Sequence, residues 1–375
     1  MASVRRLALL LCLALVAMAC GGGDDADTAE STTSTTAAPT TTTAAPETTT
    51  TTEAETTTTT TEAEVPTGPT WPLTGVLIGG DEPGEPVHPA VVVKISNNDA
   101  TARQVLRGLD QADIVFEERI EQSATRFATV FHSQLPTEVG SVRSARTSDI
   151  DIVANLNGPI FAFSGANNGV LNQVRTADRN GVLVMACEDC GNSQFSLLPD
   201  YRRPNRTVVD TLALLDEAPE DAGPPPAIYD YSNNVAELGE PAAGVQIAAA
   251  IAANFVWSEA DGGWLRYQGP AAHVTRDDVQ LAPQNVIVMT TQYLPSQIDA
   301  SSVDAITVGT REVVVYSNGH RVEGTWTRET ADDGYTLMTA DGEIIGLAPG
   351  QTWVSMTPAG TARELTADEA ASFTN

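Results

Sequence analysis

Positive charge is scarce in this sequence of 375 residues. Lysine and arginine together number 20 against 49 aspartate and glutamate residues, which gives a formal net charge of −29, and Lys94 is the only lysine. A surface with such an excess of negative charge repels the phosphates of nucleic acids and of anionic lipids. We therefore expect no nucleic-acid partner for the folded part of the chain, and clustered arginines become its most informative charged residues.

Cysteine is rarer still, with four residues in the chain. Cys12 and Cys20 lie in the N-terminal leader, which leaves Cys187 and Cys190 in a C-x-x-C motif. We expect a local disulfide between these two; a redox role is the weaker alternative, because the intervening acidic residues would raise the thiol pKa. The four histidines are widely scattered and complete no zinc site. We expect no metal and no other cofactor.

Several signature motifs of enzymes are missing from the sequence. It contains no H-E-x-x-H, no G-x-S-x-G, no G-x-x-x-x-G-K-[ST] and no G-x-G-x-x-G after a strand. Outside the leader, no apolar run reaches the roughly 20 residues that a membrane-spanning helix needs. The sequence therefore does not indicate a zinc peptidase, a serine hydrolase of the α/β class, or a nucleotide-binding enzyme.

The leader itself is the clearest feature that is present. Arg5 and Arg6 precede an apolar run over residues 7–16, and small residues follow as far as Cys20. This arrangement is typical of an export signal, and a cysteine at the cleavage point is similar to a bacterial lipobox. We predict a lipoprotein signal peptide over residues 1–20, with Cys20 as the lipid attachment site. The alternative is a plain secretory signal. The lipid anchor, of the palmitate type, would hold the rest of the chain outside the cytoplasmic membrane, attached to the cell membrane.

Residues 21–69 are dominated by Thr, Ala, Pro and acidic residues and contain no Lys or Arg. Such a segment has too little apolar surface to offset the entropy of ordering. We predict a disordered tether, with a root-mean-square reach of roughly 40 Å.

The following 70–222 segment mixes predicted strands and helices. Apolar runs and alternating patterns predict buried strands, and i, i+3, i+4 spacing predicts short helices. The strands are expected at 90–95, 113–121, 124–132 and 159–164, and the helices at 103–112, 149–156, 168–177 and 208–217.

The 223–375 segment is predicted to be rich in strands. After a proline run at 224–226, short strand patterns are separated by Gly, Asp and Pro turns, with one helix expected at 247–254. The fold class expected for the whole is α+β, a layered sandwich of sheet and helix with a mixed α/β N-terminal part and a β-rich C-terminal part. Two separate domains and one intertwined body both fit these patterns.

The strands at 113–121 and 124–132 are expected to form a hairpin around residues 122–123. In the simplest register one face forms core, with Ile114, Phe116, Ile120, Phe127, Thr129 and Phe131. The opposite face would then collect Glu117, Arg119, Glu121 and Arg126, whose charges become neighbours.

Arginines near this hairpin are the best candidates for a binding site. Arg143 and Arg146 lie in a loop that leads into the predicted helix at 149–156. Together with Arg126, and with Glu117 and Glu118 nearby, they could bind carboxylate or phosphate through guanidinium forks and helix N–H groups. The alternative is a structural network of ion pairs between these arginines and the neighbouring acidic residues.

A resemblance to a known family supports the fold class. The chain resembles the YerB-like bacterial lipoproteins, which are catalogued as a domain of unknown function with N- and C-terminal parts. The motifs that carry it are GLDQADIVFE at 108–117, TRF at 125–127, GSVRSAR at 140–146, NVIV at 285–288, EGTW at 323–326 and PGQTW at 349–353. The resemblance implies layers of sheet and helix on an extracytoplasmic anchor, and it supplies no reaction.

This chain departs from the family pattern in two places. Asn205 and Arg206 stand where a His-Asn pair is expected, and the motif at Cys187 and Cys190 is not part of that pattern. A family site that used this histidine would be incomplete in this chain.

The sequence favours a binding or scaffolding module for an anionic cell-envelope component over an enzyme. The partner would be a cell-wall polymer, such as a peptidoglycan peptide or a teichoic polymer, or an envelope protein. One alternative is a cell-envelope hydrolase or transferase that uses Glu117, Glu118 and Glu121 as acid and base, with Arg143 or Arg146 stabilising developing charge. Another is a solute-binding lipoprotein, although the strand-rich second half does not indicate a cleft between two α/β lobes.

Overall fold

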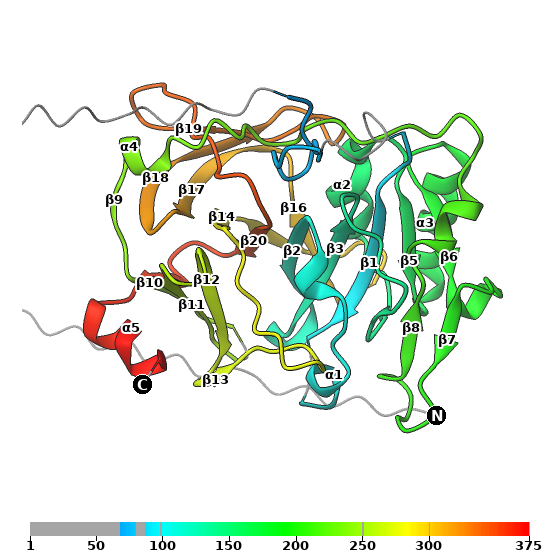
Figure 1. Cartoon of the computed structure of the whole chain (residues 1–375). Helices are drawn as coiled ribbons and strands as arrows, with labels where there is room; N and C mark the ends of the chain where they lie inside the picture. Colours follow the sequence, from blue (N-terminus) through cyan, green and yellow to red (C-terminus); the bar gives the residue numbers. More distant parts are fainter. Residues whose placement is uncertain (1–67, 80–86, 98–99, 250, 300, 375) are drawn as a thin grey trace, which may run out of the picture. The chain divides into compact units, whose positions relative to one another are not determined.

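A computed structural model describes residues 68–79, 87–97, 100–249, 251–299 and 301–374 (Figure 1). The predicted signal peptide, Cys20 and nearly all of the predicted tether lie outside the described residues. None of the helices within these ranges has the length and apolar character required to cross a membrane.

One large mixed sheet runs through the molecule, and strands from both halves of the chain build it (Figure 1). Its order is β19-β18-β17-β14-β20-β2-β3-β1-β5-β6, and β9 pairs with β18. At its centre β2, from the N-terminal half, pairs in parallel with β20, from the C-terminal half. The strands span β1 Val91–Ser96, β2 Ile114–Arg119, β3 Thr125–Phe131, β5 Ile160–Phe163, β6 Val184–Cys187, β9 Glu240–Pro241, β14 Asn285–Thr290, β17 Gly309–Ser317, β18 His320–Arg328, β19 Thr336–Met338 and β20 Thr352–Thr357.

Three smaller sheets and a few short helices complete the described residues. The smaller sheets have the orders β13-β12-β11-β10-β21, β15-β16 and β4-β8-β7. The predicted α+β class, mixed in the N-terminal part and β-rich in the C-terminal part, is confirmed. The remaining elements are β4 Val139–Gly140, β7 Phe195–Leu197, β8 Thr207–Val209, β10 Gly244–Ile247, β11 Ala253–Ser258, β12 Gly263–Gln268, β13 Ala271–Ala272, β15 Gln292–Pro295, β16 Val303–Ile306, β21 Ala362–Glu364, α1 Ala100–Gln104, α2 Ser148–Val153, α3 Asn168–Arg179, α4 Val235–Leu238 and α5 Ala367–Thr374.

The centre of the main sheet is covered on both faces. Alternate residues of β1, β2 and β3 belong to two different apolar cores, so successive side chains enter opposite layers. The first core contains residues of α2 and α3, and the second contains residues of β10, β11 and β12. We call these the helix face and the small-sheet face of the main sheet.

The predicted register of the β2–β3 hairpin is wrong by one residue. Ile114 lies opposite Val130 and Phe116 opposite Ala128, so Phe127 and Phe131 lie on the other face. The loop is longer than expected, since β2 ends at Arg119 and β3 begins at Thr125, and Gln122 within it has a positive φ of 59°. A shift of one residue moves every side chain of a strand to the opposite face. The predicted row of charges is therefore split between the two faces.

Three predicted helices are also wrong. Residues 247–254 contribute to β10 and β11, because pairing of β11 with β12 overrides the helix propensity of an alanine-rich run. Residues 208–217 contain the end of β8 and a short 3-10 turn. Residues 103–112 are broken at Gly108, whose φ of 74° ends any regular helix there.

Candidate functional site

The parallel strands of the main sheet end at one edge. β14, β20, β2, β1, β5 and β6 all run in the same direction, and the antiparallel β3 starts at the edge where they end. In open α/β sheets ligands bind outside the carboxyl ends of parallel strands. The predicted site residues lie at this edge.

Residues 141–145 form a connection between the ends of β1 and β5. The main-chain N–H of Arg143 donates to the carbonyl of Lys94 at 2.8 Å, and the Arg143 carbonyl accepts from the N–H of Ser164 at 2.9 Å. The N–H of Ala145 then donates to the Gly165 carbonyl at 3.1 Å. These hydrogen bonds hold the loop that carries Arg143 and Arg146, which we call the arginine loop, beside the first residues of β3.

Arg126, near the start of β3, is buried with 3% of its surface exposed. Its Nη1 donates to the Ser144 carbonyl at 2.9 Å. Its Nε has no hydrogen-bond partner, and no carboxylate among the described residues forms an ion pair with it. Arg126 is therefore a buried cation that carries a single hydrogen bond and no direct ion pair within the described part of the chain, and the charges of Glu121 and Glu118 act on it only from a longer distance.

The three predicted arginines come together at this point. Burial lowers the pKa of Arg126, and so do the charges of Arg146 and Arg143, so that this pKa is about 9. Arg143 donates through Nη1 to the Ser96 hydroxyl at 3.1 Å and to the Asn205 side chain at 3.0 Å. Arg146 pairs with Glu121 through Nε, at 3.1 Å, and Nη2. We define Arg126, Arg143 and Arg146 as the arginine cluster. Arg143 and Arg146 donate to side chains, whereas Arg126 donates to a main-chain carbonyl.

Sequence reasoning missed the buried group below this cluster. The only lysine, Lys94, contacts Glu118 and also Asp149, the latter at 2.5 Å, and all three side chains are at most 1% exposed. Burial raises the pKa of Glu118, as does the charge of Asp149, while Lys94 lowers it. Asp149 also accepts the main-chain N–H of Arg146 at 2.6 Å. The lysine therefore joins β1, β2 and α2 and positions the arginine loop.

Glu117 does not belong to the arginine cluster. It lies on the small-sheet face, where its Oε2 accepts from Nη2 of Arg266 and Nε1 of Trp353, each at 3.0 Å. Arg266 is fully buried, with its guanidinium 4.6 Å from the centre of the Trp353 ring. Arg266 and Trp353 are far from Glu117 in sequence, so no local pattern indicated these two partners.

The carboxylates proposed for acid–base chemistry are separated by the sheet. Glu117 faces Arg266 on one side, and Glu118 faces Lys94 on the other. Glu121 is held by Arg146. Glu117 therefore does not share a space with the other two, and Glu118 and Glu121 are each engaged by a basic side chain.

Cys187, the last residue of β6, forms a disulfide with Cys190. The neighbouring Glu188 accepts from the Ser164 hydroxyl at 2.8 Å and from Arg203 at 2.8 Å. Within the described ranges no three His, Cys, Asp or Glu side chains are grouped so that they could hold a metal ion.

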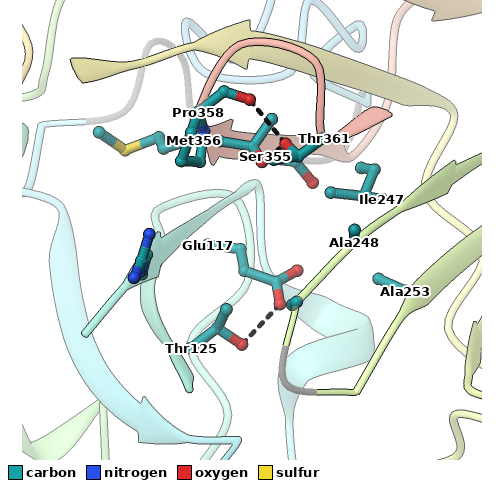
Figure 2. A pocket seen from close by; sticks show the side chains of 12 residues that line it. Glu117, Thr125, Ile247, Ala248, Ala253, Ser355, Met356, Pro358 and Thr361 are labelled. Atoms are coloured by element: carbon teal, nitrogen blue, oxygen red, sulfur yellow. Dashed lines mark hydrogen bonds between the residues drawn. The ribbon is translucent and has the colours of Figure 1, made fainter. Parts of the chain in front are cut away.

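Glu117 also lines a pocket on the small-sheet face (Figure 2). The pocket has a volume of about 230 Å³. Glu117 and Thr125 lie on one side, Ser355 and Met356 on another, and Ala253 on a third (Figure 2). Sequence analysis did not indicate this pocket, because its walls come from strands that are distant in the chain.

Two buried groups outside the site give a prediction for the pH dependence of stability. Burial raises the pKa of Asp113 to about 6 and lowers that of His132, with help from the charge of His88, to about 4. Between about pH 4 and 6 the folded protein holds an extra proton at Asp113, so this contribution to stability falls as pH rises. Over the same range the unfolded chain holds the extra proton at His132, so the contribution of His132 to stability rises with pH. The opposite contributions of Asp113 and His132 nearly cancel.

Substitution of either residue should therefore make the pH-dependent contribution of the other to stability measurable. Relative to the wild type, His132→Phe is expected to lose roughly 3 kcal/mol of unfolding free energy as pH rises from about 4 to 6. Asp113→Asn is expected to gain stability over the same range. Urea unfolding at several pH values measures both slopes, and parallel profiles for the three proteins would contradict the assignment.

The fold and the site together define a class: an α+β protein whose N- and C-terminal parts share one sheet, with basic side chains at the edge where its parallel strands end. The chain belongs to the family described as protein of unknown function (DUF3048), whose N-terminal domain matches residues 73–221 and whose C-terminal domain matches residues 244–354. The predicted membership of the YerB-like family is confirmed.

Two comparisons with individual proteins agree with this assignment. The chain is 26% identical over 278 residues to "Putative lipoprotein YerB" of Bacillus subtilis (strain 168), a match that covers 71% of this chain and 81% of the relative. The crystal structure of the YerB protein from Bacillus subtilis has the same fold, with a TM-score of 0.66 and 20% identity over 79% of this chain and 99% of that chain.

Proposed function

We propose that this protein is a lipid-anchored extracytoplasmic module that binds an anionic component of the cell envelope through the arginine cluster. In this proposal Cys20 carries the lipid, and the anchor attaches the folded part to the outer side of the cell membrane. The leader sequence supports this location, as does a relative that is named as a lipoprotein.

The observation that carries the proposal is the buried guanidinium of Arg126. A buried charge is costly unless a counter-charge and hydrogen bonds compensate it. Arg126 makes one hydrogen bond, to a main-chain carbonyl, and its Nε has no partner among the described residues. In a chain with a net charge of −29, the site concentrates cations at one point. A phosphate or carboxylate bound between these guanidiniums would supply the missing acceptors.

Arg126→Met tests this proposal because it removes the charge and keeps most of the side-chain volume. We expect retention of the full-length protein on purified cell walls to fall at least tenfold. The free energy of unfolding should change by no more than about 1 kcal/mol, since only one neutral acceptor loses its partner. Sedimentation with walls that carry anionic polymer, and with walls stripped of it, tells a polymer phosphate from a peptidoglycan carboxylate.

The matched control is Arg363→Met, which removes the same charge from an exposed side chain paired with Glu369. Equal retention of Arg126→Met and the wild type would refute the proposal. Equal loss in the two variants would also refute it, because it would show that only overall charge matters.

A further inference from the structure

The pocket in Figure 2 opens where two parallel strands of the main sheet separate. β2 and β20 pair from Ile114 and Thr352 as far as Glu117 and Ser355. Beyond that point β2 continues only with β3, to Arg119, while β20 continues only with β14. The pocket therefore lies at the carboxyl ends of two central strands, on the opposite face from the arginine cluster.

The gap between the strands is held open by a tyrosine. The Tyr293 hydroxyl accepts from the main-chain N–H of Arg119 at 3.0 Å and donates to the Met356 carbonyl at 2.8 Å. The tyrosine thus replaces the direct strand-to-strand hydrogen bonds that would close the sheet. The Arg119 N–H and the Met356 carbonyl, which the separation of the strands would leave unpaired, are therefore both hydrogen-bonded to the tyrosine.

Two hydrogen-bond donors in the polar lining of the pocket have no acceptor among the described residues. Ser355 is 3% exposed, and its Oγ has no hydrogen-bond partner among the described residues. The Nε of Arg119 is likewise unpartnered, and within the described part of the chain no carboxylate pairs with this arginine. The carboxylate of Glu117 is already neutralised by Arg266. A buried hydroxyl and a guanidinium that lack acceptors favour an anionic ligand.

The rest of the lining limits the size and the character of that ligand. Ile247, Ala248 and Ala253 supply an apolar wall. The volume of about 230 Å³ has room for roughly eight water-sized groups at about 30 Å³ each. An inorganic anion would leave the apolar wall uncovered, whereas a long chain would not fit.

We propose that this pocket binds a small carboxylate with a short aliphatic body, held by Arg119 and Ser355 and covered by the wall at Ile247 and Ala253. Such a ligand can be a free short-chain acid or the C-terminal residue of a peptide. This site is separate from the arginine cluster, and its occupancy does not depend on the function proposed above.

Calorimetric titration of the full-length protein with pentanoate and with N-acetylalanine tests this site and tells the two sources apart. We expect at least one of them to bind with a dissociation constant in the millimolar range, and the uncharged amide of the same compound to bind at least tenfold more weakly. Arg119→Gln should weaken binding of the acid at least tenfold, and Ser355→Ala severalfold.

Two further variants keep the test decisive. Arg363→Gln is the control for loss of a surface charge and should bind as the wild type does. Ala248→Leu adds bulk at the exposed rim, so the protein should keep its stability and lose the ligand. The proposal fails if acid and amide bind equally, if Arg119→Gln binds as the wild type does, or if neither acid binds at millimolar concentration. Retention on cell walls, measured on the same variants, should not change.

Discussion

Replacing Lys94 by methionine is expected to lower the free energy of unfolding by about 3–5 kcal/mol, because it leaves two buried carboxylates without their cation. Glu118 and Asp149 both contact the ammonium group, and none of the three side chains is more than 1% exposed. Methionine has nearly the same length and no charge, so the loss arises from electrostatics rather than from a cavity. Urea unfolding at neutral pH, followed by circular dichroism, measures the change.

A background without the carboxylates provides the control. In a Glu118→Gln, Asp149→Asn protein, the same Lys94→Met substitution should cost much less, since neutral amides need no counter-ion. The side-chain amide oxygen that Asp149→Asn introduces would still accept the N–H of Arg146, so the start of α2 should be preserved. If Lys94→Met costs the same in both backgrounds, the lysine acts through packing and the electrostatic explanation is wrong.

Arg266→Met is expected to produce a loss of similar size, about 3–5 kcal/mol, on the other face of the sheet. The substitution leaves Glu117 buried with neutral donors only, namely Trp353, Thr125 and Asn97. It also removes the guanidinium from its place 4.6 Å from the Trp353 ring centre. Because Arg266 lies on β12 and Glu117 on β2, the pair links the five-stranded sheet to the main sheet. Thermal and urea unfolding both report the loss.

The double variant Glu117→Gln, Arg266→Met should recover most of this stability, since replacing both members of a buried pair is often close to neutral. An exposed pair serves for comparison. Arg363→Met breaks the contact with Glu369, in which both side chains are more than 40% exposed, and should change the free energy of unfolding far less than Arg266→Met does. A double variant as unstable as Arg266→Met alone would show that packing of the arginine stem, rather than its charge, stabilises the contact.

Local patterns predicted much of the fold correctly. The apolar run that contains Lys94 and the strands that follow Asp113 and Pro159 all form as expected, because continuous apolar segments bounded by turns determine buried strands with few alternatives. The gathering of Arg126, Arg143 and Arg146 also follows from local sequence, since a hairpin and a loop close to it in the chain supply all three.

The errors have a different origin. The β2–β3 strands are apolar on both faces, so alternation cannot decide which of Phe116 and Phe127 faces the helices, and the length of the loop at Gln122 decides it instead. The helix expected at 247–254 does not form, because this segment holds the end of β10 and the start of β11, and pairing of β11 with β12, not the local sequence, determines its conformation. Two partners of Glu117, Arg266 and Trp353, come from β12 and β20, and pairings over such distances leave no trace in a single sequence.

The position of β20 determines when the molecule can assemble. It is the last strand of the main sheet along the chain, yet it occupies the middle, between β14 and β2. A growing polypeptide that stops before Thr352 would carry two unsatisfied sheet edges, the kind of surface that recruits other chains. Closure of the centre must therefore await the C-terminal segment, and such distant pairings fold slowly and favour helpers that shield incomplete chains from one another.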